Sequence, residues 1–417
     1  MNASDLQNFS SSASDLLFGH ILPFWCGPAV DQEQGGWMGW LSNDLKPDRA
    51  KPKGLILHCR ILWTFSAVHR ARPEKIFQQM ADRAFDYLMS RFWDARCGGV
   101  FWQLNDAGRV LDDSKKIYGQ AFFIYALAEY HQAFGAPAAL AKAMEVFGLM
   151  EQHARDPAQG GYLEVRRRDW SEAGPDARLS DKDMNEKKSM NNHLHVLEAC
   201  TNLHRAGGEE RVGQRLRELL QLFEERILDA RSQHFHHFFD EAWNVRSDSY
   251  TFGHDIEGSW LLCEAAEELA DPGWRQRTDA TALRMSEVAL REAVQSDGAL
   301  CYEGRHGKII DYGRECWPQA EAVIGFLNAF QLSGDPRYFA AARRVWDFID
   351  RHLVDRVHGD WFWRITPEGR VDETLPKVSE WKGPYHASRA CLETIRRLNA
   401  ISTARHIKSI ETPHTPQ

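Results

Sequence analysis

The sequence has no long apolar run, no closely paired cysteines and no basic stripe. A run of about 18 apolar residues, which a membrane-spanning helix needs, does not occur. The eight cysteines are scattered singly without a C-x-x-C pair, so we expect reduced thiols rather than a disulfide framework or a zinc ribbon. The net charge of -8, without clustered Lys and Arg, disfavours nucleic acid as a partner. The N-terminus lacks the basic and then apolar segments of a signal peptide, so we expect a cytoplasmic protein that does not bind membranes.

The chain is rich in flat aromatic rings and in groups that titrate near neutral pH. It contains 15 tryptophans and 18 histidines. Tryptophan rings stack on the apolar faces of sugars and histidines transfer protons, although tryptophans are also common in cores. This composition suits carbohydrate chemistry.

A pattern repeats six times along the chain. Short aromatic stretches led by Gly, Asp or His begin at residues 35, 98, 160, 234, 297 and 359. Apolar residues recur between them at helical spacing, which predicts helices over 4–25, 55–71, 74–92, 117–134, 138–154, 190–207, 211–228, 256–270, 274–295, 316–334, 336–354 and 384–401. Two helices and one short extended piece in every 60 or so residues indicate a repeated architecture.

The predicted helices fall into two classes. The segment 211–228 has one charged face, as expected of a surface helix, whereas 117–134 and 316–334 are apolar nearly all round. We therefore predict an all-α fold, an (α/α)6 barrel with short β-hairpins or extended pieces between helix pairs. A polar insertion at 169–189 interrupts the pattern. We expect one catalytic domain over residues 1–405 and a disordered tail over 406–417.

Unusual polar and aromatic residues gather near the starts of alternate helices. If these helices form the inner ring, their starts face one end of the barrel and line one pocket. The residues concerned are Arg60, Tyr118, Asn191, His195, His254, Glu257, Trp317 and His386.

Two histidines are each followed three residues later by a glutamate. His195 precedes Glu198 and His254 precedes Glu257, so each pair shares one helical face. A carboxylate beside an imidazole fixes its tautomer and suits proton transfer, although the same spacing also suits a plain ion pair. Recurrence at equivalent positions favours the functional interpretation. His193 and His195 point to different sides of a helix, so we predict no metal clip there and a structural role for His193.

Other polar and aromatic residues allow more than one interpretation. Arg60 lies in an apolar helix, so its guanidinium needs an anionic or hydrogen-bonding partner, such as a substrate oxyanion. The "HFHHFF" cluster at 234–239 is expected to be solvated or to serve packing. Four tryptophans are either core rings or sugar-stacking rings: Trp317, Trp361, Trp363 and Trp381.

Six blocks in order carry a family resemblance. They are "KGLILHCRILWTFSAVHR", "KIYGQAFFIYALAEYH", "MNNHLHVLEACTNLHR", "GHDIEGSWLLCEAAEEL", "CWPQAEAVIGFLNAF" and "WKGPYHASRACLE". Together they resemble the cellobiose 2-epimerases of the N-acylglucosamine 2-epimerase superfamily, from about residue 15 to about residue 400. The resemblance implies an (α/α)6 barrel whose active site needs neither a metal nor a cofactor.

The resemblance also implies roles for individual residues. His254 and His386 correspond to the two acid/base catalysts, with Glu257 orienting His254. His195 corresponds to a histidine that assists at the reactive end of the sugar, and Arg60 to an arginine that steadies the enediolate oxygens. The implied substrate contacts are Tyr118 and Asn191, and the implied stacking rings are Trp317 and Trp381. The family often has two adjacent tryptophans before "PQAE", but here Cys316 precedes Trp317.

The expected activity is 2-epimerisation at the reducing end of β-1,4-linked disaccharides, which turns cellobiose into glucosyl-mannose and lactose into epilactose. The expected partner is the sugar alone, bound by a monomer or homodimer. One alternative is a mannose 2-epimerase or mannose–fructose isomerase, which the Cys316 departure keeps open. A sugar-binding regulator is another. A third alternative is a glycoside hydrolase, which would need a pair of carboxylates drawn from Asp255, Glu257 and Glu321.

Overall fold

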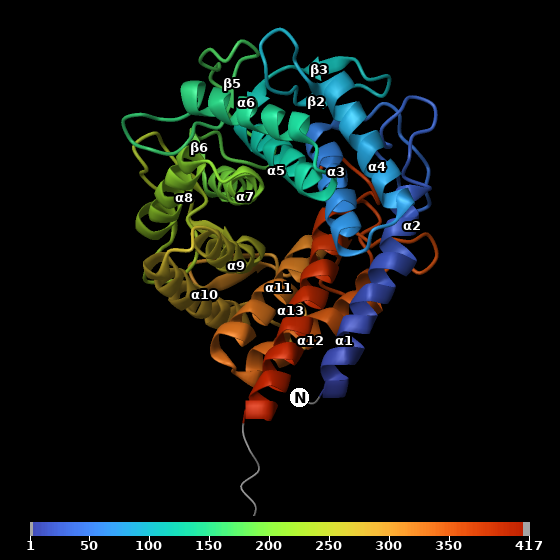
Figure 1. The fold of residues 1–417 in the computed structure, drawn as a ribbon, viewed down its shortest axis with the longest axis vertical. Coiled ribbons are helices and arrows are strands. Elements are labelled where there is room, and N and C mark those ends of the chain that lie inside the picture. The colour runs from blue at the N-terminus through green and yellow to red at the C-terminus, as the bar shows by residue number, and fades with distance from the viewer. Residues whose placement is uncertain (1–2, 412–417) are drawn as a thin grey trace, which may run out of the picture.

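A closed ring of helices forms the centre of the molecule. The computed structural model describes residues 3–411, with side chains from residue 4 to residue 403. Over this range six inner helices each contact the next, and the last contacts the first (Figure 1). They are α3 (Leu55–Ala71), α5 (Ile117–Phe134), α7 (Met190–Gly207), α9 (Phe252–Glu268), α11 (Cys316–Ser333) and α13 (Tyr385–Glu411).

An outer layer of helices surrounds this ring. Helix α1 (Ala3–Leu16) continues through a π-helical turn at 17–21 into α2 (Leu22–Cys26), and α1 packs on α13. The other outer helices each pack on the inner helix before them: α4 (Lys75–Tyr87), α6 (Pro137–His153), α8 (Glu210–Leu222), α10 (Pro272–Glu292) and α12 (Pro336–Phe348). The predicted (α/α)6 barrel is confirmed.

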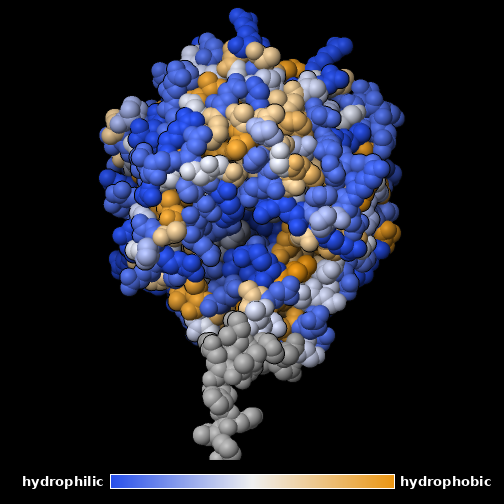
Figure 2. Space-filling view, viewed as in Figure 1, coloured by the Kyte–Doolittle hydropathy of each residue, from blue (hydrophilic) through white to orange (hydrophobic). Residues whose placement is uncertain are grey.

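Burial explains why the two helix classes differ in sequence. Helix α5 is buried on every side from Ile117 to Tyr130, because it packs against both inner neighbours and an outer helix. Helix α8 buries Val212, Leu216 and Leu219 on one face and leaves its charged residues outside. Apolar area removed from water stabilises both arrangements. On the face shown in Figure 2 the surface is mostly hydrophilic and is hollowed at the centre of the ring.

Short antiparallel strands link the repeats at one end of the barrel. The strands directly before inner helices are β1 (Lys53–Gly54), β4 (Lys115–Lys116), β6 (Lys188–Ser189), β8 (Ser249–Thr251) and β11 (Arg314–Glu315). Their respective partners come from the next repeat: β2 (Gln103–Leu104), β5 (Val165–Arg166), β7 (Phe238–Phe239), β9 (Glu303–Arg305) and β12 (Arg364–Ile365). Two further strands, β3 (Val110–Asp112) and β10 (Lys308–Asp311), extend the sheets of β2 and β9.

One contact recurs between the aromatic stretches and the inner helices. The fourth residue of an inner helix accepts a hydrogen bond from a backbone N–H of the stretch, as His193 Nε2 does from Tyr162 N at 2.9 Å. A side chain at Gly161, whose φ is +73°, would place Cβ 2.5 Å from that nitrogen. His58, Gln120, Asp255 and Gln319 make the equivalent contact. The structural role predicted for His193 is confirmed.

Most helix boundaries lie within three residues of the prediction when the π-helical turns at 88–92, 223–227 and 349–353 are included, and two differ by more. Helix α9 begins at Phe252, four residues earlier than expected, because Gly253 in its first turn weakens the helical signal. Helix α13 continues to Glu411, past the predicted end near residue 401. The stretch expected to be disordered, 406–417, therefore overlaps the end of α13, and residues 412–417 lie outside the described residues. One domain over residues 1–405 stays a prediction.

A search of the described chain finds no helix with the length and apolar character that crossing a bilayer requires.

Candidate active site

A cavity of about 790 Å³ opens at the end of the barrel where the inner helices begin. This volume lies within the range of about 300–1,000 Å³ that is usual for small-molecule sites. All nine residues expected to form a site line this cavity: Arg60, Tyr118, Asn191, His195, His254, Glu257, Trp317, Trp381 and His386. The prediction that helix starts converge on one pocket is confirmed.

Three histidines reach the cavity from three different inner helices. His195 comes from α7, His254 from α9 and His386 from α13. The indole of Trp317, from α11, contacts two of them, with ring centroids 4.7 Å from His254 and 5.7 Å from His386. Gly253 permits this approach, because a Cβ there would lie 2.5 Å from the indole.

The first predicted His–Glu pair is present. His195 Nδ1 lies 2.9 Å from Glu198 Oε2. Burial opposes ionisation of Glu198, but the charge of Arg389 and the hydrogen bonds from His195 and Tyr385 lower its pKa to about 2. Glu198 is therefore a carboxylate, His195 holds its proton on Nδ1, and Nε2 is left for a molecule in the cavity.

The second predicted pair is wrong. His254 Nδ1 lies 2.5 Å from Thr251 Oγ1, while Glu257 Oε1 accepts a hydrogen bond from Arg389 Nη2 at 2.5 Å. Among the described residues no hydrogen bond or ion pair joins Glu257 to His254, so the contact by which Glu257 would orient His254 is not formed. Burial lowers the pKa of His254 well below its ordinary value, helped by the nearby His237.

His386 has a carboxylate partner from another helix. Its Nδ1 lies 2.7 Å from Oε1 of Glu321 on α11. Burial, together with the charges of Arg60 and Arg389, lowers the pKa of His386 well below its ordinary value. His254 and His386 are thus both neutral at neutral pH, which is the state in which an imidazole accepts a proton.

A buried arginine that the sequence analysis did not single out lies beneath the histidines. Arg389 Nη1 donates to Glu198 and lies against the hydroxyl of Tyr385, while Nη2 donates to Glu257 and, at 2.7 Å, to Glu321. The sequence signal was a lone arginine among small and apolar residues in "YHASRACLE", the same signal that marked Arg60.

One group of side chains has the spacing of metal ligands. Ligand atoms of Glu257, Glu321 and His386 lie within 4.8 Å of one another. Both carboxylates already accept from Arg389, so a divalent cation there would face the positive charge of the guanidinium. These residues therefore suit an arginine-centred ion cluster better than a metal site.

Arg60 is held in place by polar groups. Nη1 donates to Trp381 O at 2.6 Å and Nη2 to the hydroxyl of Tyr118 at 3.3 Å. The guanidinium also lies over the ring of Phe122, 4.9 Å from its centroid. Among the described residues no carboxylate forms an ion pair with Arg60, which leaves its positive charge available to an anionic group in the cavity.

The polar insertion borders the cavity, which sequence reasoning did not predict. Its residues 178–183 and Asp176 contribute to the lining. Lys116 Nζ donates to Arg178 O at 3.1 Å and to Leu179 O at 3.0 Å and so ties the insertion to the start of α5. The rings of Trp102 and Trp381, with centroids 5.7 Å apart, also line the cavity, and Lys116 Nζ lies 4.8 Å from the centroid of Trp102.

The carboxylates expected for a hydrolase do not form a pair across the cavity. In the described chain only Glu257 of the three lines it. Glu321 lies in the cluster below, and Asp255 Oδ2 lies 2.7 Å from Nδ1 of the buried His234. This contact also shows that His234, in the "HFHHFF" cluster, serves packing and is not solvated.

Comparisons with known proteins agree with this geometry. The sequence model of the N-acylglucosamine 2-epimerase (GlcNAc 2-epimerase) family matches residues 36–390. The chain belongs to this family. It is similar to a cellobiose 2-epimerase of Bacteroides fragilis, with 41% identity over 90% of this chain and 95% of the relative. The chain is therefore a member of a family of isomerases, as the resemblance predicted.

Two further relatives place the chain within the N-acylglucosamine 2-epimerase family. The solved cellobiose 2-epimerase of Spirochaeta thermophila superimposes with a TM-score of 0.87 at 40% identity, over 95% of this chain and 98% of that one. A D-mannose isomerase of Marinomonas mediterranea is 22% identical over 90% of this chain and 95% of its own length.

Proposed function

We propose that the protein is a sugar 2-epimerase that interconverts glucose and mannose at the reducing end of β-1,4-linked disaccharides. The observation that carries this proposal is the pair of neutral histidines, His254 and His386, that reach one cavity from different helices with Trp317 in contact with both. Inverting a carbon requires a proton to leave from one face and to return on the other. Two separate imidazoles suit that task.

The proposed reaction begins after the sugar ring has opened to the aldehyde. One histidine removes the proton from C2, the C2–H electron pair forms the C1–C2 double bond of an enediolate, and the carbonyl electrons move to O1. The other histidine, which has taken up a proton from solvent, then delivers it to the opposite face of C2, while the electrons on O1 re-form the C1=O1 double bond. Proton transfer by positioned side chains contributes about 10²–10⁴-fold to such reactions.

Arg60 is proposed to stabilise the intermediate. Negative charge develops on the enediolate oxygens, and a fixed cation or hydrogen-bond donor there is worth more in a water-poor site than in solution. Arg60 meets this need because Trp381 O and Tyr118 hold its guanidinium and no carboxylate of the described residues forms an ion pair with it. Burial raises the pKa of Tyr118, so its hydroxyl stays protonated as a donor.

A disaccharide is favoured over a monosaccharide. The cavity extends beyond the histidines to a rim of further aromatic rings, among them Trp40, Trp102 and Trp363. Relatives named cellobiose 2-epimerase share 34–41% identity with this chain, against 22% for the D-mannose isomerase. Delivery of the proton to C1 instead of C2 would yield a ketose, so a monosaccharide epimerase or isomerase is the second candidate, favoured by Cys316 at the cavity wall.

The test is a product assay with cellobiose, lactose and mannose, each incubated separately with the protein. Glucosyl-mannose from cellobiose and epilactose from lactose are the expected products. Conversion of mannose but of neither disaccharide would transfer the assignment to the second candidate. Release of free glucose from cellobiose would indicate a hydrolase.

A further inference from the structure

The proposed reaction leaves one step without an assigned residue. A reducing sugar in water is almost entirely a closed ring, and its C2 proton becomes acidic only when C1 is an aldehyde. Ring opening needs a base for the proton on O1 and an acid for the ring oxygen O5. In the proposed function His254 and His386 act at C2, and the other titratable groups of the cavity are candidates for opening the ring.

A count of hydrogen-bond donors separates the three carboxyl groups around Arg389. Glu198 accepts from three side chains, namely His195, Tyr385 and Arg389. Glu321 also accepts from three: Trp260 at 3.1 Å, His386 at 2.7 Å and Arg389 at 2.7 Å.

Glu257 differs from these two glutamates. In the described chain it accepts from Arg389 alone, and it is the member of the trio that lines the cavity. Donors stabilise the ionised form, and three buried carboxylates around one guanidinium cannot all stay charged at low cost. Glu257 therefore holds a proton more readily than the other two glutamates, and its carboxyl group lines the cavity.

We propose that Glu257 and His195 open the sugar ring, and that the site therefore has a second, separable activity as a mutarotase, interconverting the α and β anomers of its reducing sugar. This inference rests on the proposed function, because it assigns the step that must precede C2 chemistry. Glu257 is the acid toward O5, and Nε2 of His195 is the base toward the hydroxyl on C1.

The step balances without any further reactant. Nε2 of His195 takes the proton of O1, the O–H electron pair forms the C1=O1 double bond, and the C1–O5 bond breaks. Its electron pair goes to O5, which takes the proton from Glu257. Rotation about C1–C2 followed by the reverse step closes the ring on the other face of C1 and returns both protons.

The electrostatic surroundings agree with this assignment. Burial and the neighbouring Glu321 raise the pKa of Glu257 to about 7, although Arg389 opposes the shift. A carboxylic acid whose pKa lies near neutral pH is partly protonated at that pH and can donate its proton. The titratable and charged groups that interact with Glu257 are Tyr118 on α5, His195 and Glu198 on α7, Glu321 on α11, and Tyr385, His386 and Arg389 on α13.

The experiment measures two rates in one sample. The α anomer of cellobiose is dissolved with the protein, and NMR follows its conversion to the β anomer and the appearance of glucosyl-mannose. We expect the wild-type protein to accelerate anomer conversion well above the spontaneous rate. Glu257→Gln keeps the size of the side chain and an oxygen that accepts from Arg389. This variant should reduce the acceleration of anomer conversion by at least about 100-fold. Glu257→Asp should recover part of it.

Two further variants separate this step from C2 chemistry and from structural effects. His386→Gln should lose epimerisation while keeping anomer conversion within about threefold. Glu264→Gln, a matched change at the other end of α9, should leave both rates unchanged. Matching near- and far-ultraviolet circular dichroism spectra of the wild type and Glu257→Gln would show that the fold is intact.

The outcomes for the two proposals are distinct. If the wild-type protein forms no epimer, the proposed function fails. If it forms the epimer but Glu257→Gln accelerates anomer conversion as the wild type does, the ring-opening assignment is overturned. The ring-opening assignment is also overturned if His386→Gln loses both epimerisation and anomer conversion.

Discussion

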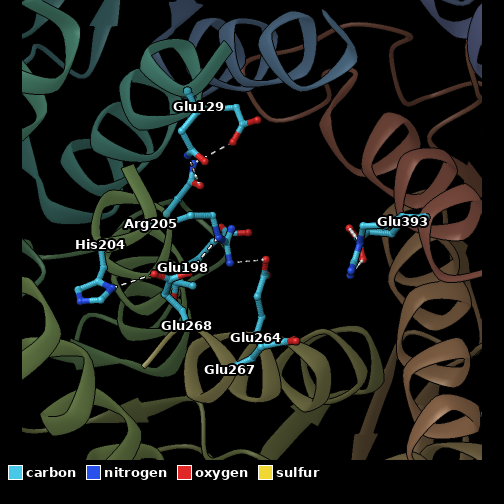
Figure 3. A network of polar contacts seen from close by, with 12 residues as sticks. Glu129, Glu198, His204, Arg205, Glu264, Glu267, Glu268 and Glu393 are labelled. Atoms are coloured by element: carbon cyan, nitrogen blue, oxygen red, sulfur yellow. Dashed lines mark hydrogen bonds and ion pairs between the residues drawn. The ribbon is translucent and has the colours of Figure 1, made fainter. Parts of the chain in front are cut away.

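The barrel contains two clusters of arginine and glutamate, one at each end of its inner helices. In the Arg389 cluster, under the cavity, the arginine meets Glu198, Glu257 and Glu321, and all four side chains are at most 3% exposed. In the Arg205 cluster, near the C-terminal ends of α7 and α9, Arg205 binds Glu264 and Glu268, each at 3.1 Å (Figure 3).

The two clusters use the same residue types in different surroundings. The side chains of Arg205 and Glu264 are about a third exposed, so water screens their charges. In the Arg389 cluster water is excluded, and the few available donors decide which carboxyl group ionises. The comparison shows that the two clusters differ in burial rather than in residue types.

The largest expected difference between the two ends of the barrel is in catalysis. His254→Ala or His386→Ala should lower turnover by at least about 10³-fold, because each removes a proton-transfer group from C2. His204→Ala removes a histidine that pairs with Glu268 at the other end, at 2.9 Å, and should leave turnover unchanged. Chromatographic product analysis measures both. Comparable losses in all three variants would show that the histidines act through the fold.

The next difference concerns stability. Arg389→Met leaves three buried carboxyl groups without their shared cation and should lower the free energy of unfolding by about 3–5 kcal/mol. Arg205→Met, in the screened cluster, should cost no more than about 1 kcal/mol. Urea unfolding of the two variants measures this difference. Equal costs would mean that burial does not distinguish the clusters.

The smallest expected difference is in the pH dependence of stability. The pKa of Glu257 is raised from 4.5 in the unfolded chain to about 7, so the folded protein holds this proton more tightly. Its contribution to stability is fully present below pH 4.5 and is lost as the pH rises through about 7. Glu257→Gln should therefore flatten the fall of the unfolding temperature across this range.

Glu198 contributes to the pH dependence of stability with the opposite sign. Its pKa is lowered from 4.5 to about 2, so its contribution is present above pH 4.5 and is lost as the pH falls toward 2. Glu198 thus adds no slope in the range where Glu257 acts. If Glu257→Gln follows the wild-type pH curve of unfolding temperature, the proton is not on Glu257.

Local signals in the sequence predicted much of the fold. The ranges of α5 and α7 agreed to the residue, because an apolar helical pattern ended at Gly135 and Gly208, which adopt the left-handed conformation favoured at helix ends. The location of the pocket was predicted because polar residues at alternate helix starts are unusual. The pairing of His195 with Glu198 was predicted because it lies within one turn of one helix.

Contacts between distant segments could not be predicted in the same way. Glu257 was assigned to His254 from spacing, but a guanidinium 132 residues away in sequence takes its oxygen. The partner of His386 lies 65 residues away, and nothing in either local sequence indicates the other. Such pairs depend on how the ring closes, which no helical pattern encodes.

The central claim is that the two histidines move a proton at C2 and return one from solvent. The most direct measurement is conversion of cellobiose in deuterated water, with mass spectrometry and NMR of the product. The account predicts one deuterium at C2 of glucosyl-mannose. Epimer formed without deuterium at C2 would contradict it.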